Sequence, residues 1–393
     1  MAKKSDFRTI NPDIEELDQK IQHHRRKIFK RVLKVIVAVL TVIVVAELWM
    51  ALRTYDSYEA RVVTTQGDRS ASSFMDFNGN VIEYSNDGIV CLAGDGELIW
   101  NQAFEMAAPK VSICENYLAV YDKSGTEIYI MTQTGQNKKL ETSMPINTLC
   151  IAQQGTIAVL MKGDENYFVK LYDKTGKELA NGEFYSSQGK IPVDIALSYD
   201  GKKLAVAMID ITGGAVDSEV TFYNFGSVGQ NEIDNNVGSY TYKDTLISEI
   251  EYVSKNKMIA IGDTNTIVFD GAQKPEPTKE ITYENEPISV FHSDKYLGMT
   301  YVNNDEGYHI KVFDLNGNIV MENDTDIPYG KVELLNNNEI CVLGEFECEL
   351  YTIHSIRKFS YTFDSPIYKV IHQNGYNGYI FIREGAIEEV RLK

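Results

Sequence analysis

Regularly spaced prolines place the strongest constraint on the fold of this 393-residue chain. Six of its nine prolines are each followed by several short apolar segments and a polar turn, and these are Pro109, Pro145, Pro192, Pro287, Pro328 and Pro366. They lie 36 to 47 residues apart, except for one interval of 95 residues that has room for two units. A period of about 40 residues with several strands per unit is typical of a β-propeller. Proline suits the start of such strands because it cannot donate to a strand ladder.

The number of units predicts eight blades, with seven as the alternative. First strands are expected near eight positions, namely Ala71, Pro109, Pro145, Pro192, Thr245, Pro287, Pro328 and Pro366. The last unit has room for only three strands before the chain ends, and residues 58–66 (YEARVVTTQ) are a suitable fourth strand. Pairing of the first and last strands would close the ring and protect its sheet edges. The predicted fold is therefore all-β.

An apolar run at residues 32–52 predicts one transmembrane helix before the propeller. Its only polar interruptions are Lys34, Thr41 and Glu47. At about 1.5 Å per residue, this segment can cross a hydrocarbon core of about 30 Å. Residues 1–34 contain ten Lys or Arg, whereas residues 53–72 contain three. The positive-inside rule then places the N-terminus in the cytoplasm and the propeller outside the cell membrane.

The resulting domain organisation has four parts. Residues 1–31 are a basic cytoplasmic leader, predicted to be helical because Asn11 and Pro12 form a suitable helix start. Residues 32–52 are the transmembrane helix, residues 53–57 a juxtamembrane linker, and residues 58–393 the extracytoplasmic propeller. The leader is expected either to contact anionic lipid or to dock a partner protein.

The charge balance excludes nucleic acid as a partner of the propeller. Residues 35–393 contain 28 basic and 51 acidic side chains. A surface of that sign repels phosphate backbones and favours cations or basic protein surfaces.

Sequence motifs for catalysis or metal binding are missing. The chain contains no Cys-x-x-Cys, His-x-x-x-His, Gly-x-Ser-x-Gly or phosphate-loop motif. The histidines after the leader are expected in separate blades, at His292, His309, His354 and His372. Residues 76–80 (DFNGN) are expected to form a hairpin turn and not a calcium loop. We therefore predict no catalytic, cofactor-binding or metal-binding residues, and no cofactor.

The five cysteines indicate packed interior positions and not a disulfide framework. Cys114 and Cys150 each lie five residues after a unit-opening proline, a position that is apolar in other units. Cys341 and Cys348 are expected to face each other across a hairpin that turns at residues 344–345. Whether these two form a disulfide is open from the sequence.

Two resemblances bear on the fold. Residues 94–100 (GDGELIW) resemble the Asp-Gly…Trp blade ending of quinoprotein-like propellers, which include quinone-cofactor dehydrogenases and a lipoprotein scaffold of outer-membrane protein assembly. The whole layout resembles an uncharacterised family of single-pass membrane β-propeller proteins from Clostridia-type bacteria. These resemblances imply the fold and do not imply an activity.

The sequence thus predicts a non-catalytic binding scaffold, anchored in the membrane, for an envelope protein or cell-wall component. One alternative is a quinoprotein-like or glycan-active enzyme. Another is a transmembrane sensor that signals through the short cytoplasmic leader.

Overall fold

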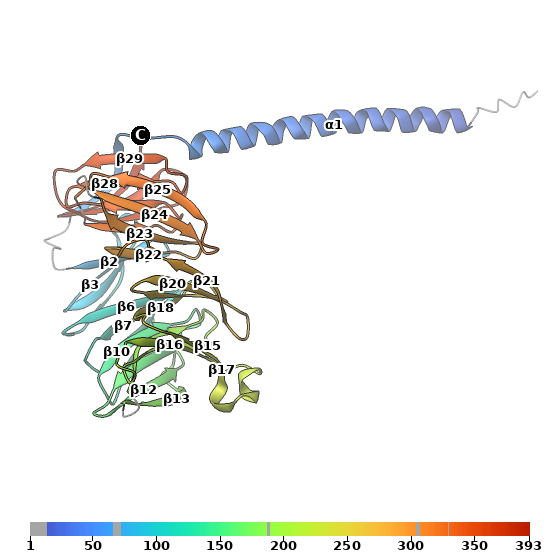
Figure 1. The fold of residues 1–393 in the computed structure, drawn as a ribbon. Coiled ribbons are helices and arrows are strands. Elements are labelled where there is room, and N and C mark those ends of the chain that lie inside the picture. The colour runs from blue at the N-terminus through green and yellow to red at the C-terminus, as the bar shows by residue number, and fades with distance from the viewer. Residues whose placement is uncertain (1–13, 66–71, 187–188, 304–306, 329) are drawn as a thin grey trace, which may run out of the picture. The chain divides into compact units, whose positions relative to one another are not determined.

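The computed structural model describes residues 14–65, 72–186, 189–303, 307–328 and 330–393. In α1 and β1, the side chains of residues 14–19, 47, 48, 50, 51, 62, 64 and 65 lie outside the description. The chain divides into two compact units, residues 1–53 and residues 54–393. Helix α1 (Ile14–Ala51) makes up most of the described part of the first unit, and strands dominate the second (Figure 1).

The second unit is an eight-bladed β-propeller, as predicted. Each blade is a four-stranded antiparallel sheet, and seven of the eight are built from consecutive strands. Blade 1 comprises β2 (Ser73–Phe77), β3 (Asn80–Ser85), β4 (Gly88–Leu92) and β5 (Leu98–Ala103), and blade 2 comprises β6 (Pro109–Cys114), β7 (Tyr117–Asp122), β8 (Glu127–Thr132) and β9 (Asn137–Glu141). Blade 3 comprises β10 (Ile146–Ile151), β11 (Ile157–Lys162), β12 (Asn166–Tyr172) and β13 (Glu178–Tyr185), and blade 4 comprises β14 (Lys190–Leu197), β15 (Lys203–Asp210), β16 (Asp217–Asn224) and β17 (Asn236–Tyr242). Blade 5 comprises β18 (Ile247–Tyr252), β19 (Lys257–Gly262), β20 (Asn265–Asp270) and β21 (Glu276–Thr282), and blade 6 comprises β22 (Ser289–His292), β23 (Tyr296–Val302), β24 (Tyr308–Asp314) and β25 (Ile319–Thr325). Blade 7 comprises β26 (Lys331–Leu334), β27 (Ile340–Leu343), β28 (Glu347–Tyr351) and β29 (Arg357–Thr362), and blade 8 comprises β30 (Ile367–His372), β31 (Gly378–Arg383), β32 (Ala386–Leu392) and β1 (Tyr58–Thr65).

The ring closes as predicted, through pairing of the two ends of the propeller sequence. Strand β1 pairs antiparallel with β32, from Tyr58 opposite Leu392 to Thr65 opposite Ala386. Tyr58 packs against three aromatic rings of blades 7 and 8, with centroid distances of 5.1 Å to Tyr361, 5.8 Å to Phe363 and 5.2 Å to Phe381. Residue 66, the last of the predicted strand, lies outside the described residues.

The first strand of each blade lies toward the centre of the ring. First strands of neighbouring blades contact one another, as β6 and β10, β10 and β14, β14 and β18, β22 and β26, and β30 and β2 do. The middle strands are covered by the adjacent blades, which explains their nearly continuous apolar sequences. In β11, five consecutive residues from Ile157 to Met161 are completely buried.

The turn and proline predictions are confirmed by local geometry. Gly176 and Gly317 have φ angles of +86° and +81°, and the carboxylates of Asp173 and Asp314 accept backbone N–H groups within the same turns. Residues 76–80 form the expected hairpin turn, in which Asp76 accepts the N–H of Gly79 at 2.7 Å. Pro192 lies inside β14, but β14 is an edge strand and its ladder shifts register between Pro192 and Asp194. An edge strand with a bulge is a position that tolerates proline.

Trp100 joins blade 1 to blade 2, consistent with the blade-ending role of the segment at 94–100. Its indole N–H donates to the carbonyl of Gln133 at 2.9 Å. Gly135 has a φ angle of +80°, and a Cβ there would lie 2.8 Å from the Trp100 side chain. Glycine therefore permits the close approach of the β8–β9 turn to the indole.

All five cysteines are free thiols, so Cys341 and Cys348 form no disulfide in this structure. The prediction that they face each other is wrong, because in the β27–β28 ladder Cys341 lies opposite Leu350 and Cys348 lies opposite Leu343. Cys114 is buried and Cys150 is half-buried, each packed against an apolar cluster between blades, as predicted.

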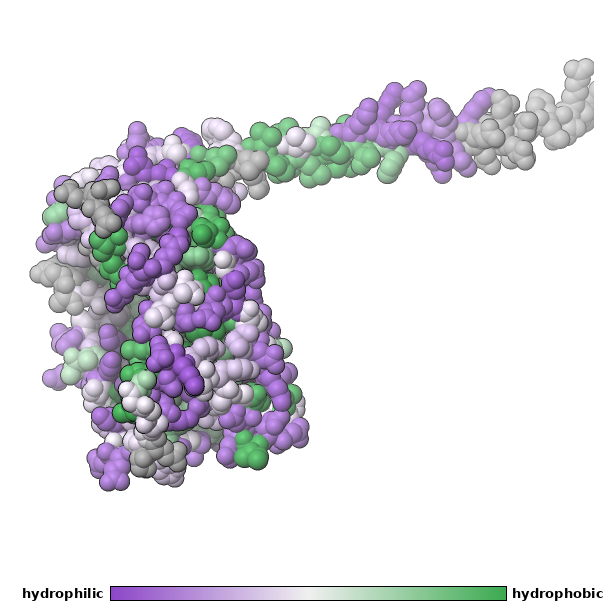
Figure 2. Space-filling view, viewed as in Figure 1, coloured by the Kyte–Doolittle hydropathy of each residue, from purple (hydrophilic) through white to green (hydrophobic). Residues whose placement is uncertain are grey.

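Helix α1 changes in polarity along its length, with a polar N-terminal part and an apolar part after it (Figure 2). Within the described part of the chain, no helix is long and apolar enough to cross a membrane. The predicted transmembrane segment at 32–52 includes residues 47, 48, 50 and 51, and the side chains of these four residues are not described. The transmembrane segment therefore stays a prediction. The predicted helix start at Asn11 and Pro12 also lies outside the described residues.

Candidate functional site

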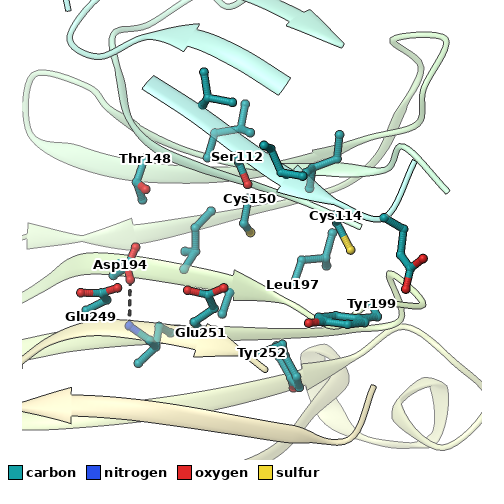
Figure 3. A pocket seen from close by; sticks show the side chains of 18 of the residues that line it. Ser112, Cys114, Thr148, Cys150, Asp194, Leu197, Tyr199, Glu249, Glu251 and Tyr252 are labelled. Carbon is teal, nitrogen blue, oxygen red and sulfur yellow. Dashed lines mark hydrogen bonds between the residues drawn. The ribbon is translucent and has the colours of Figure 1, made fainter. Parts of the chain in front are cut away.

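One cavity of the propeller lies among the first strands of blades 1 to 5 (Figure 3). Its volume is about 510 Å³, and it is lined by residues of β6, β10, β14 and β18 together with Met75 of β2 and residues of the adjoining turns. First strands from different blades converge here because the ring brings them together at its centre. The cavity is thus built from segments that belong to successive repeats of the sequence.

One wall of this cavity is acidic. Asp194 on β14 lies beside Glu249 and Glu251 on β18 (Figure 3). A carboxylate oxygen of Asp194 accepts the backbone N–H of Ile250 at 2.8 Å, which joins blade 4 to blade 5. No lysine or arginine is present among the described residues that line the cavity. The wall therefore favours cationic ligands.

Burial and mutual repulsion alter the protonation of these carboxyl groups. Burial raises the pKa of Asp194 to about 7, and the negative charges of Glu249 and Glu251 act in the same direction. Burial also raises the pKa of Glu249. Because no lysine or arginine in the lining compensates their charge, these two carboxyl groups keep their protons to higher pH than free carboxyl groups do.

His292, the last residue of β22, lies next to this wall on the following blade. Its Nε2 is 3.2 Å from a carboxylate oxygen of Glu251. Burial alone would lower the pKa of His292, but Glu251 and Glu249 outweigh burial and raise it. The ligand atoms of Glu249, Glu251 and His292 all lie within 4.8 Å of one another, so small side-chain rotations would bring all three into contact with one cation.

The cysteine and tyrosine side chains of the cavity have properties of packed groups. Burial raises the pKa of the Cys114 thiol to about 12 and raises that of Cys150 further. Thiols in this state are poor nucleophiles, since the thiolate is the reactive form. The hydroxyl of Tyr199 donates to the backbone carbonyl of Val253 at 3.1 Å, which joins blades 4 and 5.

First strands of blades 7 and 8 carry a charge cluster of a different kind. Glu333 on β26 accepts from Lys369 on β30 at 2.7 and 2.8 Å and forms an ion pair with Lys331 at 2.9 Å. Burial alone would raise the pKa of Glu333, but the two lysines outweigh it and lower the pKa. The inner strands are therefore acidic at blades 4 and 5 and contain compensated charges at blades 7 and 8.

We expect replacement of Glu333 by Gln to weaken the acid dependence of propeller stability. A carboxyl group with a lowered pKa in the folded state stabilises the fold above its ordinary pKa, near 4.5, and this stabilisation is lost as the pH falls below that value. E333Q should cost about 2 kcal/mol at pH 7, because two lysines lose their partner, and much less at pH 3. Urea unfolding at both pH values measures this difference, and equal costs at pH 3 and pH 7 would contradict the assignment.

The prediction that the four histidines lie in separate blades is wrong for one pair, because His292 on β22 and His309 on β24 both belong to blade 6. His354 lies in the turn between β28 and β29 of blade 7, and His372 ends β30 of blade 8. Sequence reasoning also missed the association of His292 with two glutamates, because it searched for ligands at fixed spacings along one segment. The Glu-x-Glu pattern at residues 249–251 was the one available signal, since alternate residues of a strand lie on the same side.

Comparison with protein families gives one match, which extends over residues 51–392 and is described as a family of unknown function, DUF5711. The chain belongs to the DUF5711 family. No curated protein matches the sequence. This membership agrees with the predicted resemblance to an uncharacterised propeller family.

This DUF5711 protein is also similar in fold to several solved structures. A computationally designed protein, Ika8, matches with a TM-score of 0.57 at 13% identity, over 85% of this chain and 100% of the designed chain. A eukaryotic initiation factor matches with a TM-score of 0.49 at 13% identity, over 84% of this chain and 83% of that one. The WD40 domain of Neurospora crassa Pan2 matches with a TM-score of 0.45 at 9% identity, over 86% and 97% of the two chains. The likeness to the designed protein supports the architecture alone, because fold does not determine function.

Proposed function

We propose that this DUF5711 protein is a non-catalytic binding scaffold, and that its propeller binds a basic region of an envelope protein. The observation that carries the proposal is the acidic wall of the cavity in Figure 3, where Asp194, Glu249 and Glu251 lie together without a lysine or arginine among the described lining residues. A basic segment entering the cavity would compensate this charge. Cell-wall components with cationic groups would satisfy the same chemistry.

The rigidity of the ring supports a recognition role. The blades are joined by hydrogen bonds such as those of Asp194 to Ile250 and Trp100 to Gln133, and β1 closes the ring against β32. A preformed cavity loses little conformational entropy when a partner binds, which favours affinity.

We further propose that α1 anchors the protein in the cell membrane, with the propeller outside. Val35, Leu40 and Val45 are 63%, 55% and 59% exposed, and at 100° per residue they face three different directions around the helix. A helix segment that is apolar on all sides requires an apolar environment. The basic residues of the polar end support a cytoplasmic N-terminus.

Site-specific cross-linking in intact cells tests the proposal. A photoreactive residue at Asn116, which is exposed in the β6–β7 turn beside the cavity residue Glu115, should give one defined protein adduct. The matched control is the same photoreactive residue at Val302, which is 69% exposed. Val302 is the last residue of β23, so it lies at the end of its blade opposite to the turn between the first and second strands. The control should give no such adduct.

The outcomes separate the parts of this proposal. Adducts at Val302 and not at Asn116 would overturn binding at the cavity, and no adduct at either position would overturn the scaffold function. Protease added to the same intact cells should degrade the propeller and spare the leader. A protected propeller would overturn the proposed location.

A further inference from the structure

The side chains of Glu249, Glu251 and His292 form a compact group at the junction of blades 5 and 6. Glu249 and Glu251 are alternate residues of β18 and therefore project to the same side of that strand. His292 ends β22, the first strand of the next blade. One carboxylate oxygen of each glutamate and one ring nitrogen of His292 all lie within 4.8 Å of one another.

The backbone holds these three side chains in defined positions. Glu249 and Glu251 lie opposite Ile261 and Ile259 in the β18–β19 ladder, and His292 lies opposite Leu297 in the β22–β23 ladder. The imidazole is mostly covered, with 17% of the side chain exposed, whereas the Glu251 side chain is 54% exposed. The group thus has a fixed nitrogen at its base and carboxylates that solvent can reach.

The surroundings add negative charge and space. Asp194 contributes a third carboxyl group on the same wall, tied to Ile250 between the two glutamates. The cavity of about 510 Å³ lies in front of Glu249 and Glu251. A cation at this point would meet several negative groups and would retain room for a water molecule.

We propose that Glu249, Glu251 and His292 bind a divalent transition-metal cation of the Zn²⁺ type. Two carboxylates and one imidazole are ligands typical of Zn²⁺ and its neighbours, and three protein ligands leave a coordination position for water. Ca²⁺ and Mg²⁺ fit less well, because they prefer an all-oxygen shell. The cation joins blade 5 to blade 6 and neutralises part of the acidic wall.

This site shares Glu249 and Glu251 with the acidic wall on which the proposed function rests, but the two proposals are tested by separate experiments. Cross-linking of an envelope protein reports on the mouth of the cavity, whereas metal binding is measured on the purified chain alone. Failure of either experiment therefore leaves the other interpretable.

The test uses the purified full-length chain in detergent, with Zn²⁺ and Co²⁺ as probes and Ca²⁺ as a comparison. We expect one Zn²⁺ per chain in equilibrium dialysis, a visible Co²⁺ absorption band and a higher unfolding temperature with Zn²⁺. His292→Gln should weaken Zn²⁺ binding by at least about tenfold, because even residues that only orient a metal ligand contribute that much. Glu251→Gln provides a second variant that does not depend on the folding of His292→Gln.

The matched control is His309→Gln. His309 on β24 also has two carboxylates nearby, with Glu322 at 3.6 Å and Asp324 at 2.9 Å, but these belong to the β24–β25 pair and not to the first strands that line the cavity. This variant should bind Zn²⁺ like the unaltered chain. Substoichiometric Zn²⁺ binding, equal losses in His292→Gln and His309→Gln, or tighter binding of Ca²⁺ than of Zn²⁺ would each overturn the proposal.

Discussion

Replacement of β1 by an eight-residue Gly/Ser linker is expected to destabilise the propeller by about 5 kcal/mol or more, the sum of a lost aromatic anchor and several lost ladder hydrogen bonds. The exchange keeps α1 attached and the chain length unchanged, because β1 has eight residues. It removes the pairing with β32 and the contacts of Tyr58 with Tyr361, Phe363 and Phe381. The exposed edge of β32 should also promote aggregation.

Urea unfolding followed by far-ultraviolet circular dichroism measures this loss. The control is a Gly/Ser replacement of residues 211–216, an exposed loop between β15 and β16, which should change stability by less than about 1 kcal/mol. An unfolding midpoint that is unchanged by loss of β1, or lowered equally by the control, would mean that the ring does not depend on this closure.

The blade number and ring closure were accessible from sequence because their signals are local. Proline at or near the start of first strands, glycine at positive φ in the turns and apolar second strands each reflect a constraint on a few adjacent residues. The short last unit then required a strand from elsewhere, and residues 58–66 had the right pattern. Consistent local signals, repeated in most of the eight units, determine the fold.

The candidate site was not accessible in the same way, because it depends on contacts between blades. His292 lies a whole repeat beyond Glu251 in the sequence and meets it only because β18 and β22 lie in neighbouring blades of the ring. No spacing rule within one segment encodes such a contact. A second set of buried charges in blades 7 and 8, distinct from the Glu333 cluster, could not be anticipated either. Its members lie 19 to 40 residues apart in the sequence.

This second set is a hydrogen-bonded group of Lys358, Glu339 and Tyr379. Their exposed fractions are 4%, 9% and 0%. The ammonium of Lys358 donates to Glu339 at 2.5 Å and to the Tyr379 hydroxyl at 2.9 Å, and the hydroxyl in turn donates to the other carboxylate oxygen of Glu339. Burial and the nearby Glu339 raise the pKa of Tyr379, so its hydroxyl keeps its proton and stays a donor. Each polar group is thereby satisfied within the core between blades 7 and 8.

We expect Lys358→Met to destabilise the propeller by about 3–5 kcal/mol, because it leaves the Glu339 carboxylate buried without its cation. The double variant K358M/E339M should recover most of this loss, since it removes both charges and leaves apolar side chains of similar length. The control is Lys139→Met, which breaks an ion pair with Glu127 of the same 2.5 Å length but with side chains 49% and 33% exposed. That change should cost much less than Lys358→Met, because solvent screens an exposed pair. Urea unfolding of the four variants K358M, E339M, K358M/E339M and K139M separates these effects, and equal costs for Lys358→Met and Lys139→Met would show that burial does not determine the contribution of this pair.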